Sequence, residues 1–405
     1  MANNNKHTGP NVPALRFPEF SGEWECVPLS TYAKKITEKN KGNKIKNVLC
    51  NSATRGIVPQ SEYFDREIAN NENTDGYYVV RNQDFVYNPR KSVSAPYGPV
   101  NIYNGEDDGI ISPLYLCMKI RGIDKNYLLH YFKSPAWYPY IYQNGDSGVR
   151  HDRVSIKDEV FLAMPVSVPN GDEQRKIAKF LDAINERIAT QTKIIEELTT
   201  LRSALHQGIM SKGLEDGSWR IQTLADVLSE RTELNIDGHA VHSVSVSKGI
   251  VNQIEYLGRS FAAKDTSRYH VAYPGDVIYT KSPTGEFPYG IVKQSQISIK
   301  AALSPLYGVY VPISPEIGYI IHNHFLSAKN ALNYLHPLIQ KGAKNTINIT
   351  NQRFLQNSMP LPINKNAALL YYNAIKTVSD KIILEEMVME KFQSQKSFLL
   401  KTMFI

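Results

Sequence analysis

Two heptad patterns, separated by 194 residues, constrain the fold of this chain more than any other feature. From residue 177 to residue 209, and again from residue 371 to residue 403, apolar residues alternate at spacings of four and three, which is the seam of a coiled coil. Each seam is interrupted at two polar positions, Gln191 and Arg202 in the first. In the second they are Glu385 and Lys396, again 194 residues further on. The apolar seam positions are Ile177, Leu181, Ile184, Ile188, Ile195, Leu198, Leu205 and Ile209, and then Tyr371, Ile375, Val378, Ile382, Met389, Phe392, Leu399 and Met403.

The segments in front of the two helices are also copies of each other. GEWECVPLSTYAKKITEKN (22–40) aligns with GSWRIQTLADVLSERTELN (217–235) at an offset of 195, and Tyr97-Gly98 aligns with Tyr289-Gly290 at an offset of 192. We therefore predict a tandem duplication in which a globular domain is followed by a long helix, twice. The predicted segments are a polar, weakly ordered N-terminal leader (1–20), a first domain (21–169), a central helix (170–212), a second domain (213–363) and a C-terminal helix (364–405).

Each domain is predicted to be α+β. Short runs rich in β-branched and aromatic residues, at 76–80, 84–88 and 276–280, predict strands that are separated by Gly, Pro, Asn and Asp turns. The segments 127–141 and 317–335 predict helices. We expect a twisted antiparallel or mixed sheet of strands in each domain.

The ends of the central helix are marked by capping residues. Asn170 or Asp172 is expected to cap its N-terminus, and Glu173 places a negative charge in its first turn. Gly208 and Gly213 are expected to mark its end.

Two apolar seams in one chain favour a pairing of the two helices within one molecule. Because each helix follows its domain in the same sense, a pseudo-two-fold arrangement would make the pair antiparallel. We expect a register in which Arg202 faces Glu385 and Gln191 faces Lys396, so that polar positions meet. In the alternative, each helix packs only on its own domain.

Composition excludes several classes of protein. Hydrophobic residues make up 42% of the chain, and no apolar run approaches the roughly 20 residues of a membrane span. The N-terminus lacks the apolar segment of a signal peptide. The three cysteines, Cys26, Cys50 and Cys117, show no close pairing, which fits a cytoplasmic protein. A net charge of +7, spread along the chain, permits nucleic acid as a partner without requiring it.

No catalytic residue is predicted. The chain has no Walker A sequence and no G-x-G-x-x-G that follows a strand. His322 and His324 are two residues apart on an apolar helix and could bind a metal, but a structural role in the core is the better interpretation. No metal site is therefore predicted.

Several segments resemble the specificity (S) subunit of type I restriction–modification systems. They are VPALRFPEFSGEW near the N-terminus, MPVSVPNGDEQRKIAKFLDAINERI from residue 164, and LRSALHQGIM from residue 201. The most specific part is the Pro-x-x-x-Glu-Gln run of Pro169, Glu173 and Gln174, followed by an Ile-rich heptad helix. The resemblance covers residues 12–405, although the second copy, LPINKNAALLYY, lacks the Glu-Gln pair.

The resemblance implies two target recognition domains, each of which reads one half of an asymmetric, bipartite site in double-stranded DNA. It implies that the helices form an antiparallel coiled coil that fixes the spacing of the half-sites. Two modification (methyltransferase) subunits and the restriction (ATP-dependent translocase and nuclease) subunits would be the protein partners. S-adenosylmethionine, ATP and Mg²⁺ would bind to those partners, so no cofactor is expected in this chain.

Residues that contact DNA are expected in polar loops that adjoin the predicted strands, because base edges and phosphates are bound by Arg, Lys, Asn, Gln and small polar groups. In the first domain these are Arg55, Arg81, Asn82, Gln83, Arg90, Lys91, Tyr97, Arg150, His151 and Arg153, and in the second Lys248, Arg268, Lys281, Ser282, Tyr289, Lys341, Lys344 and Asn345.

Two other functions stay open at the level of sequence. The chain could be a non-catalytic adaptor, with two domains on a coiled-coil strut that bind proteins rather than DNA. It could also be a fragment of a fused restriction–methylation enzyme, but such a protein would require methyltransferase motifs that this chain lacks.

Overall fold

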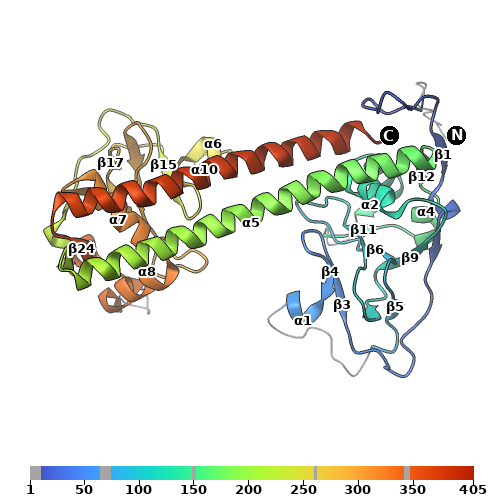
Figure 1. Cartoon of the computed structure of the whole chain (residues 1–405), viewed down its shortest axis with the longest axis horizontal. Helices are drawn as coiled ribbons and strands as arrows, with labels where there is room; N and C mark the ends of the chain where they lie inside the picture. Colours follow the sequence, from blue (N-terminus) through green and yellow to red (C-terminus); the bar gives the residue numbers. More distant parts are fainter. Residues whose placement is uncertain (1–10, 64–73, 148–151, 260–261, 342–346) are drawn as a thin grey trace. The chain divides into compact units, whose positions relative to one another are not determined.

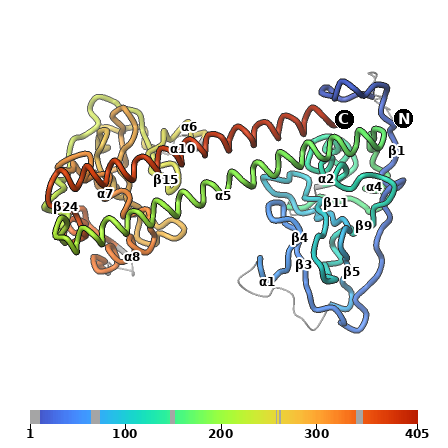
Figure 2. Tube along the Cα trace, viewed as in Figure 1, coloured from blue at the N-terminus to red at the C-terminus, as the bar shows by residue number. Residues whose placement is uncertain are grey.

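A computed structural model describes residues 11–63, 74–147, 152–259, 262–341 and 347–405 (Figure 1). The chain divides into two compact units. Unit 1 contains residues 1–192 and 387–405, and unit 2 contains residues 193–386. Two long helices, α5 (Gly171–Glu215) and α10 (Lys365–Thr402), each contribute one segment to unit 1 and one to unit 2. Figure 2 follows the course of the chain through these elements.

Unit 1 is built on a four-stranded sheet in the order β2-β9-β6-β7, accompanied by four two-stranded ribbons. All strand pairs named here are antiparallel. The sheet comprises β2 (Ala33–Lys35), β9 (Leu116–Ile120), β6 (Phe85–Tyr87) and β7 (Val100–Ile102). The ribbons are β1 (Glu25–Pro28) with β12 (Pro165–Val168), β3 (Leu49–Ser52) with β4 (Gly56–Pro59), β5 (Tyr78–Val80) with β8 (Gly109–Ile111), and β10 (Asp146–Ser147) with β11 (Val154–Ser155). The short helices are η1 (Leu29–Thr31), α1 (Gln60–Tyr63), α2 (Lys125–Lys133), α3 (Tyr138–Asn144) and α4 (Asp158–Leu162).

Unit 2 repeats this pattern of strand pairing, with a sheet in the order β14-β21-β18-β19. Its strands are β14 (Leu228–Glu230), β21 (Gly308–Pro312), β18 (Val277–Tyr279) and β19 (Val292–Gln294). The ribbons are β13 (Trp219–Thr223) with β24 (Ser358–Pro362), β15 (His242–Ser245) with β16 (Gly249–Asn252), β17 (His270–Ala272) with β20 (Ala301–Leu303), and β22 (Gln340–Lys341) with β23 (Ile347–Asn348). The short helices are η2 (Leu224–Asp226), α6 (Gln253–Leu257), α7 (Pro315–His324), α8 (Ala328–Leu335), η3 (His336–Leu338) and α9 (Asn351–Phe354). The predicted fold class, two tandem α+β domains with two long helices, is confirmed.

The two cores are also alike. In unit 1 the Tyr87 ring stacks on Phe161 with centroids 4.4 Å apart, and in unit 2 the Tyr279 ring stacks on Phe354 at 4.7 Å. All four rings are buried. Each stack joins the central strand of the sheet to the short helix that precedes the last strand of the domain.

Each helix predicted between the last sheet strand and the domain end is in fact two helices. The segment 127–141 is divided into α2 and α3 at Ser134, whose hydroxyl donates to the Tyr131 carbonyl (2.6 Å) and which precedes Pro135. The segment 317–335 is divided into α7 and α8, and Ser327 caps the second piece by accepting a hydrogen bond from the Asn330 N–H. Ser134 with Pro135 at the first break, and Ser327 at the second, interrupt a helix despite a continuous apolar pattern.

The ends of α5 differ in part from the prediction. Asn170 is the cap, since its side chain accepts a hydrogen bond from the Glu173 N–H at 2.9 Å. Gly208 and Gly213 do not end the helix, which continues to Glu215. At Gly213 a Cβ would overlap the indole ring of Trp219, so this glycine allows the following strand to pack against the helix.

The N-terminal segment is more ordered than the sequence suggested. The Leu15 N–H donates to the Thr402 carbonyl at 2.9 Å, Arg16 pairs with Glu173, and the Phe17 ring meets the edge of Phe180 at 5.6 Å. Residues 11–20 therefore pack on the two long helices of unit 1, and the prediction of a weakly ordered leader was wrong for this part. Among the described residues, no helix is long and apolar enough to cross a membrane.

The long helices pair in opposite directions within each unit. In unit 1 the start of α5 shares a hydrophobic cluster with the end of α10, which includes Ile177 and Met403. In unit 2 the end of α5 shares one with the start of α10, including Ile209 and Tyr371. All the seam positions are buried or half-buried.

The register of the pair differs from the predicted one. The predicted pairing would place residue 381 opposite His206, but His206 Nδ1 lies 2.6 Å from the Tyr371 hydroxyl, ten residues away. A register displaced by one heptad, in which Ile209 faces Tyr371, agrees with this bond and with both clusters. Burial lowers the pKa of Arg202, while nearby Tyr319, Glu386 and Tyr371 raise it.

Candidate nucleic-acid interface

The loop between β6 and β7 (residues 88–99, the β6–β7 loop) carries three of the predicted DNA-contacting residues, Arg90, Lys91 and Tyr97. Its counterpart in unit 2 is the β18–β19 loop (residues 280–291), which has the same length and carries Lys281, Ser282 and Tyr289. Both loops leave the central strand of the sheet and return to its neighbour. We therefore compare them residue by residue.

In the β6–β7 loop, the second half is held against the sheet. The Tyr87 hydroxyl donates to the Tyr97 carbonyl at 2.9 Å, and the Gly98 N–H donates to the Ala95 carbonyl at 3.0 Å. Gly98 has φ of +86°, and a Cβ there would overlap the Asn88 carbonyl oxygen. Glycine is required at this position by both its backbone conformation and its close contact.

The β18–β19 loop is held by the same contacts. The Tyr279 hydroxyl donates to the Tyr289 carbonyl at 2.8 Å, and the Gly290 N–H donates to the Phe287 carbonyl at 3.3 Å. Gly290 has φ of +97°, and a Cβ there would overlap the Thr280 carbonyl oxygen. Burial raises the pKa of both Tyr87 and Tyr279, so each phenol remains a neutral donor at physiological pH.

In unit 1 the β6–β7 loop lies beside the β10–β11 hairpin. Arg90 and Arg153 pair as an antiparallel bridge, the Val154 N–H donates to the Pro89 carbonyl (2.9 Å), and the Lys91 N–H donates to the Asp152 carbonyl (2.8 Å). The side chains of Arg90 and Arg153 are exposed. Three cations thus meet at one edge of the domain, where they can bind phosphates or the acceptor atoms of a guanine edge.

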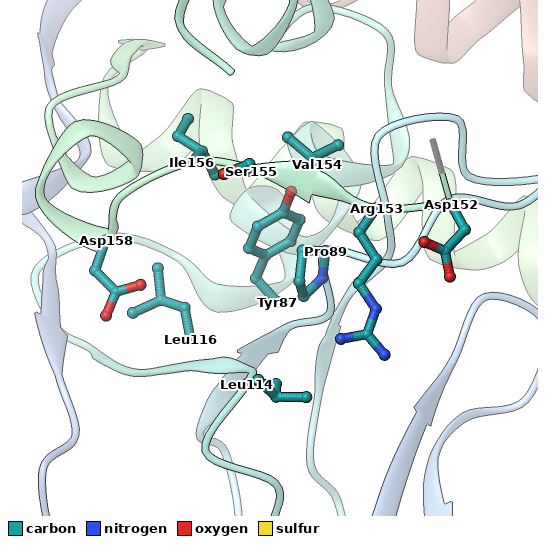
Figure 3. A pocket seen from close by; sticks show the side chains of 10 residues that line it. All are labelled: Tyr87, Pro89, Leu114, Leu116, Asp152, Arg153, Val154, Ser155, Ile156 and Asp158. Atoms are coloured by element: carbon teal, nitrogen blue, oxygen red, sulfur yellow. The ribbon is translucent and has the colours of Figure 1, made fainter. Parts of the chain in front are cut away.

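A hollow of about 440 Å³ opens beside this edge. Figure 3 shows Arg153 and Asp152 at one end of it, Asp158 at the other, and Tyr87, Pro89 and Leu116 between them. The Asp158 carboxylate is 2.6 Å from the Lys35 Nζ. The hollow therefore offers a guanidinium and a carboxylate at one end and an ion-paired carboxylate at the other.

Hairpin turns carry two further predicted residues. Arg55 lies in the turn of the β3–β4 hairpin, where it is exposed and its guanidinium lies 5.7 Å from the Tyr63 ring. Lys248 lies in the corresponding turn of the β15–β16 hairpin and is also exposed.

Three predicted residues lie at the opposite end of β6 from Arg90. Arg81 is ion-paired with Glu38 (2.6 Å) and Asp108 (3.2 Å). The Asn82 amide donates to the Gly105 carbonyl at 3.0 Å, and the Gln83 amide donates to the Asn104 side chain at 3.0 Å. These contacts hold the turn before the strand and leave few donors for a ligand.

The other predicted residues are placed as follows. Arg268 is exposed in the turn before β17, away from the β18–β19 loop in sequence. Lys341 belongs to the β22–β23 hairpin, which corresponds to β10–β11. Arg150, His151, Lys344 and Asn345 lie outside the described residues. Burial lowers the pKa of Lys281, and the smaller opposing effect of Glu230 does not reverse this shift.

Sequence reasoning missed the residues between the predicted cations and the tyrosine of each loop. In the β6–β7 loop these include Val93, which is fully exposed. The signal that could have found them is the Pro-Tyr-Gly repeated at 96–98 and 288–290, which marks both loops as copies.

The histidines on α7 are structural. Burial lowers the pKa of His322 and of His324 to about 3 each. His322 Nδ1 accepts a hydrogen bond from the Gln294 N–H, and His324 Nδ1 lies 3.3 Å from His206 Nε2. In the part of the chain that the structure describes, no group of three or more His, Cys, Asp and Glu residues is arranged to hold a metal.

Residues 23–200 match the family model described as the type I restriction modification DNA specificity domain. By this match, the segment is similar to type I DNA specificity domains. It contains the β6–β7 loop, the β10–β11 hairpin and the first part of α5. The resemblance noted in the sequence is thereby confirmed.

Solved structures extend the likeness to the whole chain. This chain resembles the S subunit of a type I restriction-modification system from M. genitalium, with 11% identity over 97% of this chain and 99% of that chain and a TM-score of 0.55. It also resembles a chain from a study of the assembly and conformational transition of the type I R-M system, with 12% identity over 93% and 96% and a TM-score of 0.51. At these identities the likeness shows the fold. No curated protein matches the sequence.

Proposed function

We propose that this chain is the DNA-specificity subunit of a type I restriction–modification complex and that each of its two domains reads one half of a bipartite site. The observation that carries this proposal is the specificity-domain match over residues 23–200, combined with the repetition of that domain in unit 2. Since unit 2 repeats the sheet and the loop contacts of unit 1, it is assigned the same function.

The proposed site is asymmetric. The two loops share their supporting contacts but differ in their polar residues, with exposed Arg90 and half-buried Lys91 in one and half-buried Lys281 and exposed Ser282 in the other. Domains with different exposed groups recognise different base edges. The half-sites are therefore proposed to differ in sequence.

The helices are proposed to set the distance between the half-sites. As a helix of 45 residues, α5 is about 68 Å long, which exceeds one turn of B-DNA, about 34 Å. Its apolar seam against α10 would keep this spacing stiff.

The chemistry is assigned to partner subunits. Two modification subunits with S-adenosylmethionine would methylate adenine, and restriction subunits with ATP and Mg²⁺ would translocate and cleave DNA. This chain would contribute recognition and a scaffold, and no catalytic group. A cytoplasmic location is proposed with these partners.

An adaptor that binds only proteins is the alternative. The basic edge formed by Arg90, Lys91 and Arg153 favours DNA over this alternative, because three cations that form no ion pair with the described residues fit a phosphate backbone.

The test is to co-express the chain with the modification subunits of its system and to map methylated adenines across the host genome. A motif of two specific half-sites separated by a fixed non-specific spacer is expected. A stable complex that methylates nothing specifically would support the adaptor instead.

A further inference from the structure

Each of the two loops contains a tight turn at its middle that projects two residues into solvent. Ser92 and Ala95 exchange backbone hydrogen bonds at 3.0 and 3.2 Å, so Val93 and Ser94 form the tip of the β6–β7 loop. Thr284 and Phe287 exchange the same pair of bonds at 3.1 and 2.9 Å, so the tip of the β18–β19 loop is Gly285-Glu286. The tips are equivalent positions of the two copies.

We propose that these tip residues determine which base each domain prefers. Val93 is assigned to the 5-methyl group of a thymine, and the Glu286 carboxylate to the exocyclic amine of a cytosine. This inference rests on the proposed function, and it adds to that function the residues and the base chemistry that distinguish the two half-sites.

The first argument is the contrast between support and tip. Ala95 and Phe287, which close the two turns, are each 9% exposed. The tyrosine, the glycine and their hydrogen bonds are common to both loops, as described above. Within one chain, therefore, duplication has kept the support of the loop and changed its tip from Val-Ser to Gly-Glu.

The second argument is the exposure of Val93. Its side chain is 106% exposed, the highest value among the exposed large hydrophobic residues in the described part of the chain. A rigid turn that presents an isopropyl group to water gains nothing for the fold. An apolar side chain in the major groove can instead contact the methyl group of thymine.

The third argument is the charge around each tip. Arg90 and Lys91 precede the apolar tip of the first loop, and Arg153 pairs with Arg90. Phosphate contacts from such cations position a reading element without selecting sequence. Glu286 is exposed and makes no hydrogen bond or ion pair with the described residues. A carboxylate repels phosphates, so its placement suits a base edge with a donor, and cytosine N4 is the donor that Glu accepts from in the major groove.

The experiment measures the affinity of the assembled methyltransferase, containing the full chain, for DNA duplexes that carry each of the four base pairs at every position of its methylation motif. The variants are Val93→Ser and Glu286→Gln, and Val93→Thr, which retains one methyl group. Ile236→Ser is the matched control, since Ile236 is 84% exposed but lies outside both loops.

For Val93→Ser, we expect the preference for thymine at one position of one half-site to fall roughly tenfold. For Val93→Thr, the preference for thymine should fall less, and Ile236→Ser should leave this preference unchanged. For Glu286→Gln, we expect a comparable loss of preference for cytosine at one position of the other half-site. The unaffected half-site reports in each case that the variant is folded and assembled.

The inference is overturned if Val93→Ser and Glu286→Gln leave every base preference as in the wild type, or if they weaken binding equally for all base pairs. Failure of the proposed function looks different, because the wild-type complex would then show no sequence preference at all. Gly98→Ala separates a tip effect from a loss of the loop, since its Cβ would overlap the Asn88 carbonyl oxygen and should weaken binding to every duplex.

Discussion

At the scale of single residues, the start of α5 is fixed by one buried carboxylate. The Glu173 side chain is fully buried, and both of its oxygens accept hydrogen bonds from Arg16 at 2.7 Å. The Trp24 indole N–H lies 3.3 Å from the same carboxylate. Gln174 completes this contact region by accepting a hydrogen bond from the Asp124 N–H and donating one to the Pro169 carbonyl. Glu173 and Gln174 are thus explained by the hydrogen bonds that they form within unit 1.

Replacement of Arg16 by Ala should destabilise unit 1 by roughly 3–5 kcal/mol, because it leaves the Glu173 charge buried without its partner. The control is Arg175→Ala, whose pair with Asp172 is exposed on the same helical turn and should cost less than about 1 kcal/mol. Urea unfolding measures both. Equal losses of unfolding free energy for the two variants would contradict the conclusion that Arg16 neutralises the buried Glu173 carboxylate.

A second residue-scale feature is the histidine pair of unit 2. Burial lowers the pKa of His206 to about 4 and that of His324 to about 3, below the ordinary value near 6.5. As the pH falls below 6.5, the unfolded chain therefore binds more protons than the folded one. Stability is complete above pH 6.5 and is lost as the pH falls toward 4, with a limiting slope near 1.4 kcal/mol per pH unit for each histidine.

In unit 1 the equivalent positions are Leu400 and Phe132. The double variant His206→Leu/His324→Phe should therefore flatten the dependence of unfolding on pH between 6.5 and 4. Thermal unfolding at a series of pH values tests this. A slope that matches the wild type would show that these two histidines do not control the acid response.

At the scale of elements, alanine substitutions at the two glycines of α5 should have opposite effects on stability. A Cβ at Gly208 meets no atom within 4 Å, so Gly208→Ala should stabilise the protein by about 0.5–1 kcal/mol through helix propensity. Gly213→Ala should destabilise it despite the same gain in propensity, because the new methyl group overlaps the Trp219 ring. Denaturant midpoints of the two variants should lie on opposite sides of the wild type.

Long elements could be predicted from the sequence, because their periodicity recurs over many residues. The seams and the duplication are examples. Local details could not. The register could not be inferred from the polar seam positions, since Arg202 lies near Tyr319 and Glu386. The break at Ser134 depends on its hydrogen bond to the Tyr131 carbonyl and on Pro135. The candidate interface was predicted in part: Arg90, Lys91, Tyr97 and Arg153 lie together, whereas Arg81 is held by carboxylates, Glu38 among them, that are distant in sequence.

At the scale of the whole molecule, the border between the compact units falls within both long helices, at residues 192–193 and 386–387. Each unit has its own hydrophobic clusters. The chain is therefore expected to open in two parts whose borders differ from the ends of the helices.

Trp219→Ala should speed hydrogen exchange in residues 193–386 and leave the strands of unit 1 unchanged, because the indole is buried in the core of unit 2. Trp24→Ala, at the equivalent place in unit 1, should speed hydrogen exchange in unit 1 and leave the strands of unit 2 unchanged. Hydrogen exchange followed by mass spectrometry resolves the two regions. A uniform rise in exchange along the chain after either change would contradict a division into units.

The shared support of the two loops has a consequence for heredity. A mutation at Val93, Ser94, Gly285 or Glu286 meets neither a core nor a required backbone conformation that the fold depends on, apart from the φ of +51° at Gly285. Selection for folding is therefore weak at these positions, whereas under the proposed function they would be under selection for the DNA sequence that is methylated. Under the proposed function, related organisms would then come to methylate different DNA sequences through changes at positions that contribute little to folding.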